Sequence, residues 1–308
     1  MSLGRFGYQP AGAGPGTGGG GFVGAPSHRD RVKGAAFKGV LIFSLVIGFA
    51  TLIVLLITVA SDGLGHLSWD FVTSFPSSLP SRAGIQSPLV GTIYLMLLVA
   101  VITVPIGVGA ALYLEEYADR RRWFNRAIEL NIQNLAAVPS IVYGILGLAF
   151  LVRGPIGLGR ALLAGALTLA LLVLPIVIIA AREAIRAVPP SIREGALALG
   201  ATRWQTIWRQ VLPASVPGIA TGSILALSRA IGETAPLILI GAIVFVPFNP
   251  SSLMDQFTAL PIQIFNWTSR PQAEFKLLAA AAILVLLGLL LTMNAFAIWL
   301  RNKYQRRW

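Results

Sequence analysis

An arginine and a glutamate interrupt an apolar helical segment of this 308-residue chain. Arg229 and Glu233 lie within Ser223–Leu237, and at a spacing of four residues they share one face of a helix. An arginine in the middle of a membrane-spanning helix costs roughly 2.5–3.5 kcal/mol, so such a residue faces a partner or an aqueous path. A guanidinium can bind two oxygens of one anion. The pair is therefore a candidate polar path, and a permanent ion pair that only fixes the helix is the alternative.

The composition places these residues in a membrane. The chain is 56% hydrophobic and 12% charged, and its mean hydropathy is +0.76, which leaves too little polar surface for a soluble globule. Stretches such as Ala161–Ala181 lack the alternation of a β-barrel strand. We therefore expect an all-α integral membrane protein with six transmembrane helices, each long enough to cross about 30 Å of hydrocarbon. The predicted spans are Phe37–Ala60, Gln86–Leu114, Ile128–Leu151, Ala161–Ala181, Ala214–Val246 and Leu277–Leu300.

The net charge of +12 marks one side of that membrane. Most of the 24 Lys and Arg residues fall in the two ends and in the loops on the same side as the ends. This bias predicts that both termini of a multi-pass membrane protein are cytoplasmic, and it argues against nucleic-acid binding. Residues 1–36, which are Gly-rich, are expected to be a flexible cytoplasmic tail. Residues 37–300 form the membrane domain, and 301–308 a basic cytoplasmic end.

Signatures of soluble enzymes are missing from the sequence. It has no Gly-x-x-x-x-Gly-Lys-Ser/Thr loop, so any use of ATP has to come from another chain. Its two histidines, His28 and His66, are far apart, and it has no cysteine, so a metal site is not expected. We expect neither catalysis nor a bound cofactor.

The predicted cytoplasmic loop 182–213 has the most specific pattern. Pro190 followed by Ser191 and Glu194 is typical of a helix start with a capping box, and Gly200 is typical of a left-handed helix end. A second short helix with Trp204 follows. Helices this short need a surface to pack against, so we expect them to dock on another subunit. A basic loop lying on anionic lipid is the alternative.

The same loop resembles that of a known family. Its run Glu194-Gly195-Ala196, Gly200 and Val211-Leu212-Pro213 is similar to the "EAA" loop of bacterial ABC-importer permeases, from which Gly195 and Gln210 depart. Four further segments, 87–94, 111–118, 134–144 and 229–237, resemble those of phosphate-importer permeases, specifically the A-type subunit (PstA).

The resemblance implies the fold of a type I ABC importer permease and a set of partners. These are a C-type phosphate permease in a heterodimer, an ATPase dimer that holds ATP and Mg, and an external phosphate-binding protein, with membrane lipid around them. The chain itself would not be an enzyme. The residues expected to couple it to the ATPase are Glu194, Gly195, Ala196, Leu199, Gly200, Ala201 and Trp204.

With that resemblance, the buried pair acquires a role. Arg229 would bind the phosphate oxygens that lose their water, and Glu233 would neutralise Arg229 when the path is empty. We expect the pair to open and close with transport. Arg182 matches a basic position of the family and is a candidate for the inner exit, although an arginine at a helix end is often an anchor.

Several alternatives stay open at this point. Sulfate or molybdate would suit one arginine as well as phosphate does. An ion-coupled secondary carrier would usually show inverted repeats, which we do not find. A membrane scaffold or sensor would leave uptake unchanged when lost. Finally, Gly218, Gly222 and Ser223 allow close helix approach and are consistent with a subunit interface.

Overall fold

The computed structural model describes residues 28–119, 121–242 and 245–304, and their contacts divide the chain into residues 1–55 and 56–308. The described residues form helices joined by loops, with one isolated antiparallel bridge between Ala161 and Gln256. Five of the helices are long and apolar enough to cross a membrane, and one bent pair would make a sixth. The predicted all-α membrane fold is confirmed.

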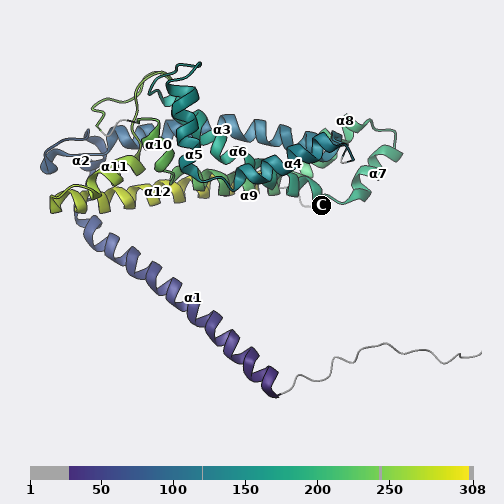
Figure 1. Ribbon diagram of the computed structural model, residues 1–308, viewed down its shortest axis with the longest axis horizontal. Helices are drawn as coiled ribbons and strands as arrows, with labels where there is room; N and C mark the ends of the chain where they lie inside the picture. The colour runs from purple at the N-terminus through teal and green to yellow at the C-terminus, as the bar shows by residue number, and fades with distance from the viewer. Residues whose placement is uncertain (1–27, 120, 243–244, 305–308) are drawn as a thin grey trace, which may run out of the picture. The chain divides into compact units, whose positions relative to one another are not determined.

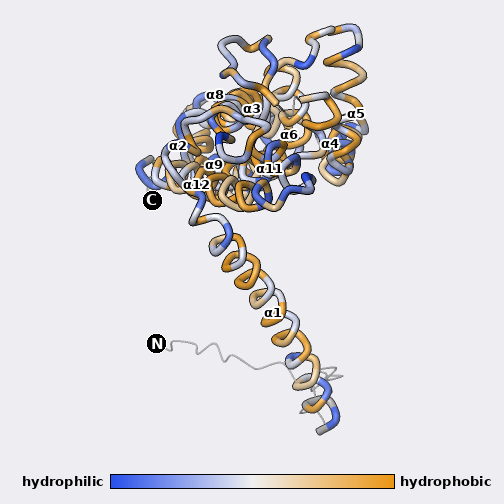
Figure 2. Tube along the Cα trace, turned by 90° about the vertical axis from the view of Figure 1, so that its left-hand side faces the viewer, coloured by the Kyte–Doolittle hydropathy of each residue, from blue (hydrophilic) through white to orange (hydrophobic). Residues whose placement is uncertain are grey.

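The first unit is the greater part of helix α1, His28–Gly63. This helix begins nine residues before the predicted membrane domain, and the rest of the predicted tail, residues 1–27, lies outside the described residues. All side chains from Val32 to Leu55 are exposed within the chain, and Figure 2 shows apolar residues along the helix with hydrophilic ones near its ends. A helix that is apolar all round is suited to lipid or to a partner helix.

The second unit is built around helix α6, Leu162–Arg186, which contributes more buried residues than its neighbours. Helices α3 (Gln86–Leu112) and α9 (Leu212–Ile231) pack on α6, and α12 (Ala273–Tyr304) packs on α9, as Figure 1 shows. The core between them contains Val99, Leu169, Val173 and Ala226 among others.

Glycines bring α9 close to α6. A Cβ added to Gly222 would lie 2.3 Å from the Cβ of Ala180, and one added to Gly218 would lie 2.6 Å from the Cβ of Ala184. The close helix approach that these small residues indicate is therefore confirmed, and for the two glycines it is an approach to α6 of the same chain.

The third predicted span is not one straight helix. Helix α4 (Trp123–Ala136) and the pair α5 (Ser140–Leu146) and η4 (Gly147–Val152, a π-helical turn) meet at an angle of 105°. Pro139 stands at the bend with an extended ψ of 137°. The proline accounts for the bend, because a proline in a helix interior removes a hydrogen bond and clashes with the preceding turn. The predicted continuous helix Ile128–Leu151 is corrected accordingly.

The fifth predicted span is also interrupted. Helix α9 ends at Ile231, three residues follow without helical structure, and a short helix α10 runs over Ala235–Leu239. Pro236 lies in the first turn of α10, where its missing N–H is tolerated. The prediction of a single helix Ala214–Val246 is therefore wrong beyond Ile231, and residues 243–244 lie outside the described residues.

Short helices gather at the end of the second unit that carries the start of α3 and the start of α12. They are η1 (Leu64–His66), α2 (Trp69–Thr73), η2 (Pro80–Arg82) and α11 (Leu260–Thr268). The rings of Phe71, Trp267 and Phe275 pack together here, with centroids 6.1 and 6.2 Å apart.

A loop covers the first turn of α6. The N–H groups of Leu162 and Leu163 donate to the carbonyls of Asp255 and Leu253, both at 2.9 Å. Three hydrogen bonds from Ser251 and its neighbour, each 2.8 Å long, hold the pKa of the Asp255 carboxyl below its ordinary value, with the Ser251 hydroxyl the largest cause. The carboxylate thus orders the loop that caps the central helix.

Candidate substrate path and coupling loop

Arg229 lies near the middle of the membrane-spanning unit. Gly218 of α9 lies against Ala184 of α6, and Gly222 lies against Ala180. The two helices therefore run antiparallel, and one turn forward along α9 corresponds to one turn back along α6. Continued to Arg229, this register reaches the level of Val173, close to the midpoint of α6. A charge at this depth needs a polar counterpart.

That counterpart within the chain is Glu233. The Nε of Arg229 donates to Oε1 of Glu233 at 3.3 Å, so the predicted pair forms. Glu233 lies just after the end of α9 and not on its face, because the helix stops at Ile231. The Arg229 side chain is 47% exposed and that of Glu233 16% exposed. The guanidinium therefore keeps donors free on an open face of the chain.

The two interrupted spans meet beside this pair. A Cβ on Gly144 of α5 would lie 2.7 Å from the Cα of Pro236 in α10, so the backbones of the two half-helices touch. Tyr143, the neighbour of Gly144, is buried, donates from its hydroxyl to the Leu135 carbonyl at 2.8 Å across the bend, and lies within electrostatic range of Arg229. Within a membrane, interrupted backbone is tolerated only where it is buried in protein or lines a water-filled cavity.

Arg182 has different surroundings from Arg229. Its guanidinium binds Glu115 at 2.9 Å and Glu129 at 2.8 Å, and its side chain is 6% exposed. Glu115 also binds Arg186 at 2.8 Å. The donors of Arg182 are thus engaged by α3's extension and by α4. Its role at the inner exit stays a prediction, and this geometry favours an anchor between helices.

The predicted cytoplasmic loop 182–213, which we call the coupling loop, contains two short helices. Helix α7 covers Pro190–Ala198, and α8 covers Arg203–Thr206 and continues as the π-helical turn η5, Ile207–Val211. Gly200 has a φ of +85°, and the N–H groups of Gly200 and Ala201 donate to the carbonyls of Leu197 and Ala196. This is a Schellman end, so the predicted left-handed cap at Gly200 is confirmed.

The capping box lies at the other helix. Helix α7 starts at Pro190 without a side-chain cap, so the box predicted from Ser191 and Glu194 is wrong. Thr202 and Gln205 form a complete box at the start of α8 instead. Pro190 already fixes φ at the first helical position, which reduces the need for a cap.

The outer surface of this loop is apolar and open. Leu199 is 91% exposed, and Trp204 and Trp208 are exposed with ring centroids 5.3 Å apart. Glu194 and Gly195 are exposed, whereas Ala196 and Ala201 are partly buried. Exposed apolar residues gathered on one loop are typical of a protein-binding surface.

Comparison with known proteins identifies the family. The family model described as "Binding-protein-dependent transport system inner membrane component" matches residues 103–306, which include α6, the coupling loop and Arg229. The chain belongs to this family of transport components. The fold seen here is that of ABC importer permeases.

Curated relatives of this transport component cover nearly all of it. The Mycobacterium tuberculosis "Phosphate transport system permease protein PstA 1" is 32% identical over 288 residues, 91% of this chain and 91% of that protein. The Bacillus subtilis "Probable ABC transporter permease protein YqgI" is 31% identical over 274 residues, 84% of this chain and 90% of that protein.

Solved structures share the fold of the transport component. A chain of a bacterial ABC transporter involved in the import of the acidic polysaccharide alginate has a TM-score of 0.62 at 20% identity, and 90% of this chain and 97% of that chain are covered. A chain of the inward-facing MetNI methionine ABC transporter has a TM-score of 0.56 at 17% identity, with 72% and 95% covered.

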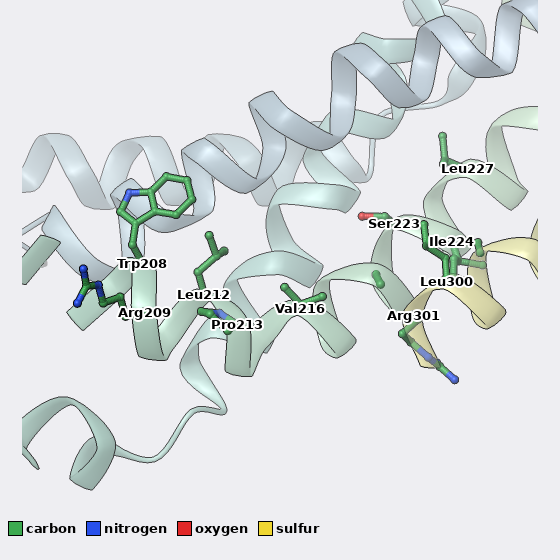
Figure 3. A pocket seen from close by; sticks show the side chains of 12 residues that line it. Trp208, Arg209, Leu212, Pro213, Val216, Ser223, Ile224, Leu227, Leu300 and Arg301 are labelled. Carbon is green, nitrogen blue, oxygen red and sulfur yellow. The ribbon is translucent and has the colours of Figure 1, made fainter. Parts of the chain in front are cut away.

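A large groove of the transport component lies away from its charged pair. It is an apolar groove of about 820 Å³ between α9 and the end of α12, lined by Leu212, Val216, Leu227 and Leu300 among others (Figure 3). Neither Arg229 nor Glu233 lines this groove. Arg209 and Arg301 also line it, but most of the lining is apolar and suits acyl chains or apolar side chains.

Sequence reasoning missed the acidic side of the coupling region. Glu115, Glu116 and Glu129 bind the arginines of α6 and of the coupling loop. A signal was present in the sequence. Two adjacent glutamates directly follow the second predicted span, on the same predicted side of the membrane as the arginine-rich loop 182–213. An isolated buried carboxylate is unfavourable, so such a pair predicts basic partners.

Proposed function

We propose that this chain is a transmembrane permease subunit of an ATP-driven importer of inorganic phosphate. The observation that carries the proposal is Arg229, whose half-exposed guanidinium lies at the level of the middle of α6 beside two broken helices. The names of the relatives at 31–32% identity support phosphate as the substrate, since one is a phosphate transport permease.

The charged pair suits an anion that must be released again. Phosphate carries one to two negative charges near neutral pH, and a guanidinium can replace two of its water contacts at once. Glu233 competes for the same guanidinium, so the anion is not held permanently. Sulfate or molybdate is the second candidate, because all three are tetrahedral oxyanions, and the relative named for phosphate decides our preference.

We assign the partners from the family and from two exposed surfaces of the chain, one around Arg229 and one on the coupling loop. Arg229 lies on an exposed face that a second permease would complete, and we assign this place to a C-type subunit. The exposed loop residues Leu199 and Trp204 would dock on an ATPase dimer, which would hold ATP and Mg. An external phosphate-binding protein would deliver the anion. These assemblies remain part of the proposal.

The orientation is assigned from charge. The coupling loop and the described end of α12 carry the basic side chains Arg193, Arg203, Arg209, Arg301 and Lys303. Positive residues favour the cytoplasmic side. We therefore place the coupling loop and both termini in the cytoplasm and the short helices α2 and α11 outside.

Replacing Arg229 by Gln tests this function. In vesicles that contain the assembled complex, Arg229→Gln should lower the initial rate of phosphate uptake at least about 10-fold, since each charge-assisted hydrogen bond contributes about 1.5–3 kcal/mol. Arg122→Gln, at a highly exposed arginine, is the matched control and should transport normally. Normal uptake by an assembled Arg229→Gln complex would refute a role in the path, and wild-type vesicles that prefer sulfate would change the substrate.

A further inference from the structure

Two adjacent glutamates join the coupling loop to the membrane helices. They lie in η3, Tyr113–Tyr117, a π-helical turn that continues α3. Glu115 binds Arg182 and Arg186 of α6, whereas Glu116 binds Arg193 of α7. One turn of backbone is thus bonded to the central helix on one side and to the coupling loop on the other.

Arg193 uses its whole guanidinium in this contact. Its Nε and Nη2 donate to Oε1 of Glu116 at 3.0 and 2.9 Å. Its Nη1 and Nη2 also donate to the carbonyls of Val188 and Ile185, at 2.6 and 2.9 Å, where α6 ends. The Glu116 side chain is 9% exposed, so it has little water to replace a lost partner.

A second contact holds the same turn. Arg203 of α8 donates to the Glu116 carbonyl and lies over the Tyr117 ring, 5.2 Å from its centroid. Both short helices of the coupling loop therefore bind η3. Arg182, which binds Glu115 of η3, also binds Glu129 of α4, the half of the third span that ends at the bend.

We propose that Arg193 is a positioning residue that couples the loop to the path: its grip on Glu116 makes η3 and α3 move with α7. This inference rests on the proposed function, because it needs an ATPase that moves the loop. A π-helical turn at this place fits the role, since such turns within helices are frequent at functional sites. Energetic coupling between distant sites is carried by such contiguous bonds and rigid helices.

Loss of the ion pair between Arg193 and Glu116 should have a larger effect than loss of a surface ion pair. An exposed pair is screened and its removal changes little. Here removal of Arg193 leaves the buried Glu116 carboxylate and the Val188 carbonyl without this donor, so α7 loses its side-chain contact with η3 and with the end of α6 at once. Only the Arg203 contact of α8 then connects the loop to η3, so movement of the loop is passed to α3 less completely.

The test measures transport and ATP hydrolysis together. Vesicles containing the assembled complex with Arg193→Met, which keeps a long side chain, should hydrolyse ATP while the phosphate taken up per ATP falls at least about 5-fold, the lower range of coupling between sites. Arg193→Lys should recover part of the ratio, and Glu116→Gln should lower it less than Arg193→Met does. Arg209→Met, at an exposed arginine of η5, is the matched control and should keep the wild-type ratio.

Each result separates the two proposals. An unchanged phosphate-to-ATP ratio in Arg193→Met, or an equal fall in Arg209→Met, overturns the coupling role and leaves the transport function intact. Equal loss of uptake and hydrolysis in Arg193→Lys and Glu116→Gln shows that the contact serves assembly alone, which also overturns it. Wild-type vesicles that take up no phosphate would instead refute the proposed function.

Discussion

Two arginines of this chain sit in apolar helices with opposite surroundings. Arg182 is closed in by Glu115 and Glu129, whereas Arg229 shares its face with Glu233 and keeps nearly half of its side chain exposed. Closing in a guanidinium with two carboxylates satisfies its donors and fixes helices, while an open guanidinium can still bind an anion. At the scale of the residue, the difference between an anchor and a binding group is the number of carboxylates within reach.

Two glycines of the coupling loop give a matched residue-scale prediction. A Cβ at Gly195 meets no atom within 4 Å, so Gly195→Ala should be tolerated and should stabilise α7 by up to about 1 kcal/mol. Gly200 has a φ of +85°, so Gly200→Ala should cost roughly 1–2 kcal/mol and lower uptake. Thermal unfolding and uptake of the two assembled variants check this. Loss of uptake in Gly195→Ala alone would mean that the docking partner needs bare backbone at residue 195.

Helix elements differ in which of them can bend. Pro217 lies inside continuous α9 and Pro175 inside continuous α6, whereas Pro139 stands at the 105° bend. Each proline removes one hydrogen bond, but tight neighbours on both sides keep α6 and α9 helical. The half-helices α5 and α10 instead pack against each other across Gly144.

The close crossing of α6 and α9 carries an element-scale prediction. Gly222→Ala places a Cβ 2.3 Å from that of Ala180 and should lower the free energy of unfolding by about 1–3 kcal/mol. Ala180→Gly in the same chain should restore most of that loss, because it removes the clashing methyl. Gly288→Ala in α12, where a Cβ meets nothing within 4 Å, is the control. Denaturation of the three purified variants in detergent measures the effect, and a double variant no better than Gly222→Ala would contradict the crossing.

Hydropathy predicted the helical membrane class and the approximate positions of the spans, because about twenty apolar residues have one common solution in lipid. It did not predict the break after Ile231 or the bend at Pro139, since the residues on both sides of each interruption are apolar and hydropathy does not register the effect of a proline on a helix. The pair of Arg229 and Glu233 followed from spacing alone and forms. The partners of Arg182 did not, because Glu115 and Glu129 are more than fifty residues away in sequence.

At the scale of the whole molecule, the two ends of the helical bundle differ in chemistry. One end carries aromatic side chains such as Phe71 and Trp267, and the other carries the arginines and glutamates of η3, α6 and α7. Basic residues prefer the cytoplasmic side of a membrane. The asymmetry underlies the proposed orientation.

The absence of cysteine makes that orientation directly testable. Ser191→Cys in α7 and Ser81→Cys in η2 introduce single thiols at exposed positions. In intact cells, a membrane-impermeant maleimide should label Cys at 81 and leave Cys at 191 unlabelled until the membrane is opened. The unaltered chain is the control, since it offers no thiol. The reverse labelling pattern would invert the assigned topology.

The contact between α6 and α9 leads to one mechanical consequence. The close packing at Gly218 and Gly222 resists sliding of α9 along α6, because Ala184 and Ala180 lie directly against these glycines, so we expect the two helices to move together. We expect any alternation that exposes Arg229 first to one compartment and then to the other to be taken up at the junction before α5 and at the junctions on either side of α10. Those few residues, rather than the long helices, are then the expected hinges.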